Sequence, residues 1–263
     1  MDLGIAGKKA LVVGASEGIG FVTAKGLAEE GAEVFICSRN PGKLVEARER
    51  LMKETGQGVE WFAADVMRAP DVAKLASWIG QKAASLDILV SAVGGSRRAR
   101  FEELRDEDWL ENYEFNVLGA VRVVRALLPA LRKARNPAIV LLGAAGAKQP
   151  YANQVVSGVH KAGILALTKS LATEFCSDGL RVNSVCPGRT LTSLWLDRAE
   201  ALGKERGVAA DAIIAEFAEE IPLRRFARPE EIAAMVVFLC SERASYITGQ
   251  SISVDGGIVR GLL

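Results

Sequence analysis

Short runs of hydrophobic residues alternate with longer amphipathic segments along this chain of 263 residues. The runs that have the length and composition of strands are 9–13, 33–37, 59–63, 87–91, 138–142, 181–185 and 251–254. The first six are apolar almost throughout, which is typical of strands covered on both faces. The main helical patterns are 18–30, 41–55, 70–84, 106–134, 151–177 and 229–241. The alternation predicts an α/β fold: a Rossmann-type, doubly wound parallel sheet of about seven strands with helices on both faces.

One region breaks this alternation. Between Thr190 and Pro222, two short helical patterns at 194–206 and 208–219 follow one another without a strand. An insertion late in a doubly wound sheet commonly covers the ligand cleft. We therefore expect residues 1–263 to form a single domain with a helical substrate lid at about 190–222. A peripheral helical hairpin is the alternative.

Composition and charge exclude several classes of protein. The 33 Lys and Arg residues balance the 32 Asp and Glu residues, so no basic excess indicates nucleic-acid binding. No run reaches the ~18 apolar residues of a membrane span, and the N-terminus does not resemble a signal peptide. His160 is the one histidine, and we expect no metal site. We expect the cysteines to be core or near-core thiols of a cytoplasmic protein: Cys37, Cys176, Cys186 and Cys240.

A glycine-rich turn follows the first strand, in "LVVGASEGIG" at 11–20. Gly14 permits the tight turn, Gly18 lets a pyrophosphate approach the backbone, and Gly20 allows close packing of the helix. The N-terminus of that helix offers unpaired N–H groups to phosphates. The spacing is G-x-x-x-G-x-G, and its place between a strand and a helix predicts a dinucleotide-binding turn.

Further motifs follow in order: "ADV" at 64–66, "FNVLGAV" at 115–121, "RVNSVCPG" at 181–188 and "SYITGQSISVDGG" at 245–257. Together with the glycine-rich turn, they resemble the short-chain dehydrogenase/reductase (SDR) family over nearly the whole chain. The block "AKQP" at 147–150 is similar to divergent members labelled 3-oxoacyl-acyl-carrier-protein reductases. The resemblance implies a nicotinamide cofactor bound by Gly14, Ser16, Gly18, Ile19, Gly20, Ser38, Arg39, Asp65, Val66, Ala92, Gly94, Lys161, Pro187, Gly188 and Thr190.

The end of the second strand, "CSRN" at 37–40, bears on the choice between NAD and NADP. An acidic residue near this point binds a ribose 2′-OH, whereas a basic residue suits a 2′-phosphate. Arg39 therefore favours NADP, although an ordinary surface arginine is the alternative. Glu17 argues the other way, because relatives that use NADP often have a basic residue there. We expect NADP rather than NAD.

The residues that the family uses on the substrate carbonyl are only partly present. Lys161 and Asn116 match the catalytic lysine and the helix asparagine, but Ala144 and Ser157 stand at the serine and tyrosine positions. In the family, the lysine lowers the pKa of the tyrosine and holds the nicotinamide ribose. A serine hydroxyl has a far higher pKa than a phenol. The resemblance therefore implies an atypical active site.

Several residues are candidates for the missing proton donor. Ser157 could relay a proton from Lys161 or from water, or it could only fill space. Tyr151 is expected to begin the helix at 151–177 and to contact substrate over the cleft. His160 flanks the reactive face, with a packing or subunit-contact role as the alternative, and Asn153 is a weaker candidate.

Basic residues lie near the expected mouth of the cleft. "GGSRRAR" at 94–100 follows the fourth strand, and its arginines are Arg97, Arg98 and Arg100. Arg189 directly follows the Pro187-Gly188 turn, so we expect it to contact substrate. Such groups could receive a carboxylate, a CoA phosphate or a carrier-protein surface, and the alternative for the loop is a solvated segment.

Two functions remain open. The first is an NAD(P)-dependent oxidoreductase that transfers a hydride to or from a carbonyl or activated alkene, with acyl thioesters and acidic molecules among its candidate substrates. The second is a non-catalytic subunit that stabilises an intact SDR partner in a heteromer, because both hydroxyl positions are lost. The resemblance also implies a homodimer or homotetramer built on the helices at 106–134 and 151–177. The helix 229–241 and the last strand would form a second contact.

Overall fold

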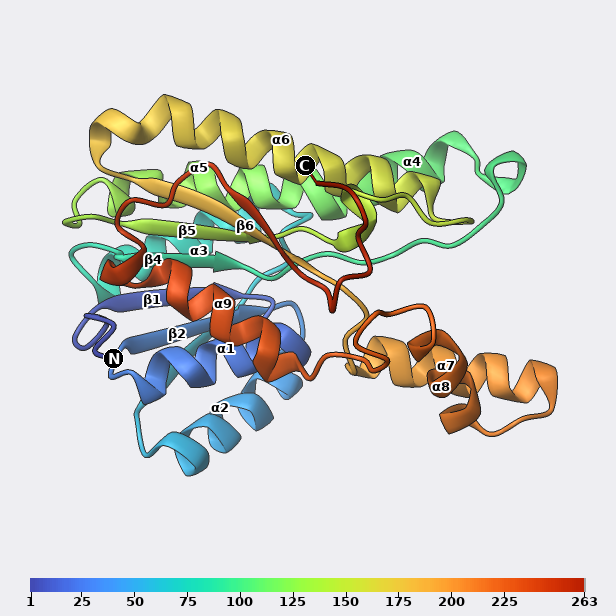
Figure 1. Cartoon of the computed structure of the whole chain (residues 1–263). Coiled ribbons are helices and arrows are strands. Elements are labelled where there is room, and N and C mark those ends of the chain that lie inside the picture. Colours follow the sequence, from blue (N-terminus) through green and yellow to red (C-terminus); the bar gives the residue numbers. More distant parts are fainter. Residues whose placement is uncertain (263) are drawn as a thin grey trace.

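The computed structural model describes residues 1–262 and contains one sheet of parallel strands (Figure 1). Its strands are β1 (Lys9–Val13), β2 (Glu33–Ser38), β3 (Val59–Ala63), β4 (Ile88–Ser91), β5 (Ala138–Leu142), β6 (Arg181–Pro187) and β7 (Ser251–Val254). They lie in the order β3-β2-β1-β4-β5-β6-β7, so the direction of winding reverses between β1 and β4. Ligands of doubly wound sheets bind at this reversal. The predicted fold class is confirmed.

Helices cover both faces of this sheet (Figure 1). One face carries α1 (Gly18–Glu29), α2 (Pro41–Thr55) and α9 (Pro229–Cys240), and the other carries α3 (Ala69–Lys82), α5 (Gly119–Leu131) and α6 (Val155–Phe175). Alternate residues of each central strand enter the two cores. In β1, Ala10 and Val12 join the core beneath α1 and α9, whereas Leu11 and Val13 join the opposite one. This explains why the strands are apolar throughout.

Two of the predicted helices differ from the structure. The pattern at 106–134 divides into α4 (Asp106–Tyr113), a π-helical turn at Glu114–Leu118, and α5. The π-helical turn contains the buried Asn116. The pattern at 151–177 begins as a helix only at Val155, because Asn153 has a φ of 58° in the left-handed region. Tyr151 therefore lies in the preceding loop, which corrects the prediction that it begins the helix.

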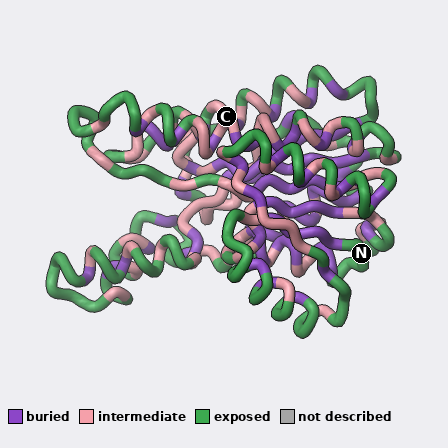
Figure 2. The backbone as a smooth tube through the Cα atoms, turned by 180° about the vertical axis from the view of Figure 1, so that it is seen from behind, coloured by how far each residue is buried: buried purple, intermediate pink, exposed green. Residues whose placement is uncertain are grey.

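The region 190–222 contains α7 (Ser193–Arg206) and α8 (Ala210–Ala218), which form a pair that projects from the body of the sheet (Figure 1). Figure 2 shows that the strands form the buried centre. The helix pair and residues 92–100, called the segment after β4 below, are mostly exposed or half-buried. In the described part of the chain, no helix is both long and apolar enough to cross a membrane. Cys37, Cys186 and Cys240 are buried thiols, but Cys176 is exposed just after α6, which corrects that prediction.

Candidate functional site

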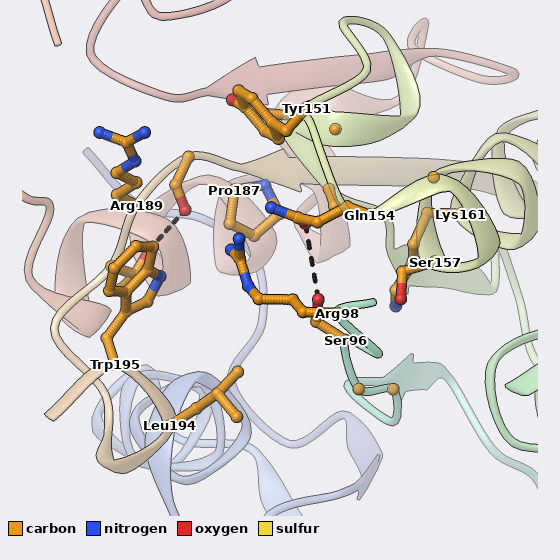
Figure 3. Close-up of a pocket in the computed structure, with 18 of the residues that line it drawn as sticks. Ser96, Arg98, Tyr151, Gln154, Ser157, Lys161, Pro187, Arg189, Leu194 and Trp195 are labelled. Carbon is orange, nitrogen blue, oxygen red and sulfur yellow. Dashed lines mark hydrogen bonds between the residues drawn. The ribbon is translucent and has the colours of Figure 1, made fainter. Parts of the chain in front are cut away.

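A cavity of about 920 Å³ opens at the carboxyl ends of the central strands, where the sheet reverses direction (Figure 3). Its lining comes from the segments that follow β1, β4, β5 and β6, together with the first turns of α6 and α7. Ile19, Lys161 and Trp195 mark its nucleotide end, its floor and its α7 wall. The cavity therefore joins residues that are far apart in the sequence.

The glycine-rich turn leaves the first N–H groups of α1 without a side-chain cap. Glu17 stands at the N-cap position, but its side chain makes no capping hydrogen bond, and the first turn of the helix has no acidic residue. Gly14 has a φ of +85°, and a β-carbon on Gly20 would overlap the carbonyl oxygen of Gly14. An uncapped helix N-terminus with open backbone in front of it fits a pyrophosphate.

The end of β2 places polar groups beside this turn. Ser38 donates a hydrogen bond from its Oγ to Ser16 Oγ at 3.1 Å. Arg39 is exposed, and its guanidinium makes neither an ion pair nor a hydrogen bond to any described residue. Lys43 pairs with Glu17 at 3.1 Å, so a positive charge lies beside this carboxylate. The positive charge of Arg39 is therefore free to meet a phosphate.

The residues expected beside adenine and nicotinamide have mainly structural contacts of their own. Asp65 accepts a hydrogen bond from the Met67 N–H at 3.0 Å, and the buried Val66 packs against Gly119. Ala92, Pro187, Gly188 and Thr190 line the cavity. A β-carbon on Gly188 would lie 2.6 Å from Asp255 Cα, so the chain passes too closely there for any side chain.

Lys161 lies on the floor of the cavity and is buried. Its Nζ donates a hydrogen bond to the carbonyl oxygen of Leu142 at 3.0 Å. Burial disfavours the charged amine and lowers the pKa of Lys161 to about 8. A β-carbon on Gly94 would overlap Lys161 Nζ, so the glycine leaves room for the amine.

Asn116 is buried beside this lysine, in the π-helical turn. Its Oδ1 accepts a hydrogen bond from the Gly95 N–H at 3.1 Å, and its Nδ2 donates to the Asn112 carbonyl oxygen at 3.1 Å. A π-helical turn widens the backbone locally and often occurs at functional sites. Here it places the asparagine so that it holds the start of the segment after β4.

The positions matched to the family's serine and tyrosine both reach the cavity, as Ala144 and Ser157. The Ser157 hydroxyl accepts a hydrogen bond from the Arg97 N–H at 2.7 Å and lies 3.2 Å from the Arg97 carbonyl oxygen, to which it can donate. This side chain is buried. The structure therefore places the Ser157 hydroxyl against the backbone of the segment after β4.

The other proton-donor candidates occupy different surroundings. Tyr151 lines the cavity, and its hydroxyl points to the side of Arg189 (Figure 3). Burial raises the pKa of Tyr151. His160 does not line the cavity: its Nδ1 lies 2.8 Å from Asn112 Oδ1, and its ring packs edge-on against Trp109. Burial lowers the pKa of His160. Its position supports the packing interpretation.

Asn153 turns the chain between β5 and α6. Its carbonyl oxygen accepts a hydrogen bond from the Ala99 N–H at 3.1 Å, so it also holds the segment after β4. Among residues 1–262, no cluster of three or more His, Cys, Asp or Glu residues could hold a metal ion.

Arginines form one wall of the cavity. Arg98 of the segment after β4, Arg189 of the turn after β6 and Arg198 of α7 all line it. The rings of Trp195 and Phe217 lie among them, with Arg198 Cζ 4.4 and 4.9 Å from the two ring centroids. The sequence analysis grouped Arg98 with its neighbours and missed Arg198. The spacing of Trp195 and Arg198, three residues apart on one helix face, is the signal that could have indicated it.

Comparison with known proteins agrees with this architecture. Residues 14–259 match the family model described as enoyl-(acyl carrier protein) reductase. The 2,3-dihydro-2,3-dihydroxybenzoate dehydrogenase of Bacillus subtilis is 32% identical over 260 residues, which cover 98% of each chain.

Solved structures are also similar. L-sorbose reductase from Gluconobacter frateurii, in complex with NADPH and L-sorbose, has a TM-score of 0.96 and 37% identity, with 100% of both chains covered. A short-chain oxidoreductase from Pseudomonas aeruginosa, with NADPH bound and described as containing an atypical catalytic center, has a TM-score of 0.90 and 33% identity over 97% of each chain. The chain therefore belongs to the short-chain dehydrogenase/reductase family of oxidoreductases.

Proposed function

We propose that this protein is an NADPH-dependent oxidoreductase that reduces a carbonyl or activated alkene through an atypical site. One observation carries the proposal: a single cavity connects the uncapped N-terminus of α1 with the buried amine of Lys161. When bound, the cofactor supplies or accepts the hydride. In the reducing direction, hydride addition to a carbonyl carbon and protonation of its oxygen would give an alcohol and NADP⁺. For an activated alkene, hydride addition to the β-carbon and protonation of the α-carbon would give the saturated compound and NADP⁺.

The choice of NADP is supported at the end of β2. Arg39 offers an unpaired guanidinium there, and Lys43 pairs with Glu17. The similar proteins from Gluconobacter frateurii and Pseudomonas aeruginosa were both solved with NADPH. A guanidinium suits a phosphate because its N–H groups match the oxygens in geometry and charge.

The proton is assigned to Lys161. With a pKa of about 8, its amine is protonated at neutral pH and can also release a proton. The Ser157 hydroxyl is already bonded to the Arg97 backbone, and Ala144 has no hydroxyl. Tyr151 is the second candidate, since it lines the same cavity. In this proposal, Lys161 also binds the nicotinamide ribose, as the matching lysine does in the family. Asn116 binds the backbone of Gly95 at the start of the segment after β4.

A non-catalytic subunit that stabilises an intact SDR partner is the alternative function. The engaged Ser157 hydroxyl and the absence of a hydroxyl at Ala144 favour it. Either function is compatible with oligomers. Leu110 and Tyr113 of α4 and Val159 of α6 are 67%, 42% and 53% exposed, which supports association through these helices, as the family resemblance implies. Light scattering of the purified protein gives its oligomeric state.

The deciding experiment is a titration of the purified protein with NADPH and with NADH. Binding is monitored through tryptophan fluorescence, because Trp195 lines the cavity. We expect selective binding of NADPH, and then oxidation of NADPH on addition of oxo compounds, enones or acyl thioesters. Selective binding without turnover of any of them would favour the non-catalytic subunit. Binding of neither nucleotide would overturn the proposal.

A further inference from the structure

The arginines of the cavity wall differ in how their charges are satisfied. Arg189 donates to Glu220 and to the Phe217 carbonyl oxygen, and its side chain is only 10% exposed. Its charge is therefore balanced by a carboxylate, and its donors are directed at protein oxygens. This changes the expectation for Arg189, because its contacts within the protein leave little of the guanidinium for a substrate.

Among the described residues, neither Arg98 nor Arg198 forms an ion pair with a carboxylate. With the Gln154 side-chain oxygen facing Arg98, a neutral amide lies 2.7 and 2.6 Å from Arg98 Nη1 and Nη2. Arg198 has a buried Nη1 that no described residue meets with a hydrogen bond. A buried donor left unpaired is destabilising and is rare in native proteins.

The same two guanidinium groups both approach one aromatic side chain of the cavity wall. Their Cζ atoms are 5.7 Å and 4.4 Å from the centroid of one indole ring, that of Trp195. Partial burial and the neighbouring positive charges of Arg198 and Arg189 lower the pKa of Arg98 to about 10, so it still carries its charge at neutral pH. Like charges repel, and an anion bound by both guanidinium groups would offset that repulsion.

Arg98 is also held in place by its own segment. Ser157 binds the backbone of the preceding residue, Arg97, and the Arg97 side chain pairs with the buried carboxylate of Asp108 at 2.6 Å. The following residue, Ala99, is bonded to the Asn153 carbonyl oxygen. The residues on both sides of Arg98 are thus anchored, which lowers the entropy that its side chain loses on binding a ligand.

We propose that Arg98 and Arg198 form a clamp for an anionic group, a carboxylate or a phosphate, carried by the substrate. One arginine comes from the segment after β4 and the other from α7, so the ligand joins the body of the protein to the projecting helix pair. A planar guanidinium pairs with either anion through two parallel hydrogen bonds. Resting on the proposed reductase function, the clamp indicates an oxo compound that carries a carboxylate or phosphate group, or the matching hydroxy compound in the reverse direction.

Binding of matched pairs of ligands tests the clamp. Calorimetric titrations compare short oxo acids of three to six carbons with their methyl esters, and inorganic phosphate forms a separate arm. Each is run with and without NADP⁺. We expect at least one acid, or phosphate, to bind at least about tenfold more tightly than the neutral esters. The Arg98→Gln and Arg198→Gln variants are each expected to lose about tenfold in affinity for that anion.

Arg105→Gln is the matched control, since Arg105 is 76% exposed, lies near the same segment and does not line the cavity. It is expected to retain the affinity of the unchanged protein. Tightest binding by an acid assigns a carboxylate, and tightest binding by inorganic phosphate assigns a phosphoryl group. Equal binding of acids and esters, no binding of any anion, or unchanged affinity in both glutamine variants would overturn the clamp. Anion binding without any NADPH binding would instead overturn the proposed reductase.

Discussion

The two halves of the cavity differ in how far they match the pattern expected from the sequence. The nucleotide half, from the turn after β1 to the end of β2, has glycines, an uncapped helix and a free arginine in the arrangement expected of a dinucleotide site. In the substrate half, Ala144 and Ser157 stand where the family resemblance implies a serine and a tyrosine, and arginines line one wall. Backbone contacts to a phosphate tolerate little change, whereas side chains that face the substrate can be exchanged on the same scaffold.

Lys161 belongs to both halves, and its replacement is expected to have the largest effect. Lys161→Met removes the amine that we propose holds the ribose and supplies the proton. We expect kcat/KM to fall by about 10²–10⁴-fold, the usual contribution of a general acid or base. In the unchanged protein, reduction should decline as the pH rises through about 8, because Lys161 then loses its proton. A pH profile that is flat across this range would assign the proton to another group.

The same replacement is expected to stabilise the fold. The pKa of Lys161 is 10.5 as a free side chain and about 8 when buried, so the unfolded chain binds more protons between these values. The penalty for burying the lysine is therefore fully present below pH 8 and disappears as the pH approaches 10.5. Lys161→Met should raise the unfolding free energy by up to about 3 kcal/mol at pH 7. In denaturant titrations, this gain should shrink with rising pH; a gain independent of pH would contradict the burial argument.

Gly20→Ala tests whether the nucleotide half still needs its close-packed turn. The new β-carbon would overlap the Gly14 carbonyl oxygen, so the turn must move away from the phosphates. We expect NADPH affinity, measured by fluorescence titration, to fall about 100-fold. Gly80→Ala is the control, because nothing lies within 4 Å of that position in α3. It should bind NADPH normally, and the alanine should slightly favour the helix. Equal affinities of the two variants would argue against pyrophosphate at this turn.

Most of the fold could be predicted from the sequence because hydrophobic patterning determines it. All seven strands match the predicted runs to within two residues at either end. The central strands β1, β4 and β5 are buried on both faces and almost wholly apolar, which makes their runs easy to recognise. The pattern could not reveal the π-helical turn at Glu114–Leu118, which interrupts the backbone hydrogen bonding without breaking the run of residues. It also missed the left-handed Asn153, which delays the start of α6.

The candidate site was predictable only where a motif fixes the backbone. The arginines of the segment after β4 are near neighbours in the sequence, yet Arg97 pairs with Asp108, whereas Arg98 and Arg100 line the cavity. An irregular segment has no period that tells the three apart. Nor could the sequence show that Ser157 would bond to a backbone sixty positions away.

Arg39→Ala tests the selectivity of the nucleotide half. The exposed guanidinium has no protein partner among the described residues, so its loss should not disturb the fold. We expect affinity for NADPH to fall about tenfold, as one charged hydrogen-bonding partner of the 2′-phosphate is removed. Affinity for NADH should be unchanged, and parallel fluorescence titrations measure both. Equal losses for the two nucleotides would mean that Arg39 does not contact the 2′-phosphate.

The smallest gain is expected from restoring the family's tyrosine. Ser157→Tyr alone should not create strong ketone reductase activity, because Ala144 still offers no hydroxyl to the carbonyl. The structure adds a second reason. A tyrosine cannot reproduce the paired contacts of Ser157 with the Arg97 backbone, so the segment that carries Arg98 loses an anchor.

Ketone reduction by Ser157→Tyr, by Ala144→Ser and by the double variant separates these two reasons. If the missing serine is the main obstacle, the double variant should reduce ketones faster than either single variant. If the segment after β4 is the obstacle, the double variant should stay inactive, and both tyrosine variants should bind anions more weakly than Ala144→Ser. A large gain from Ser157→Tyr alone would show that the substrate half had retained the older chemistry. The replacement of tyrosine by serine at position 157 would then account for the difference between the two halves.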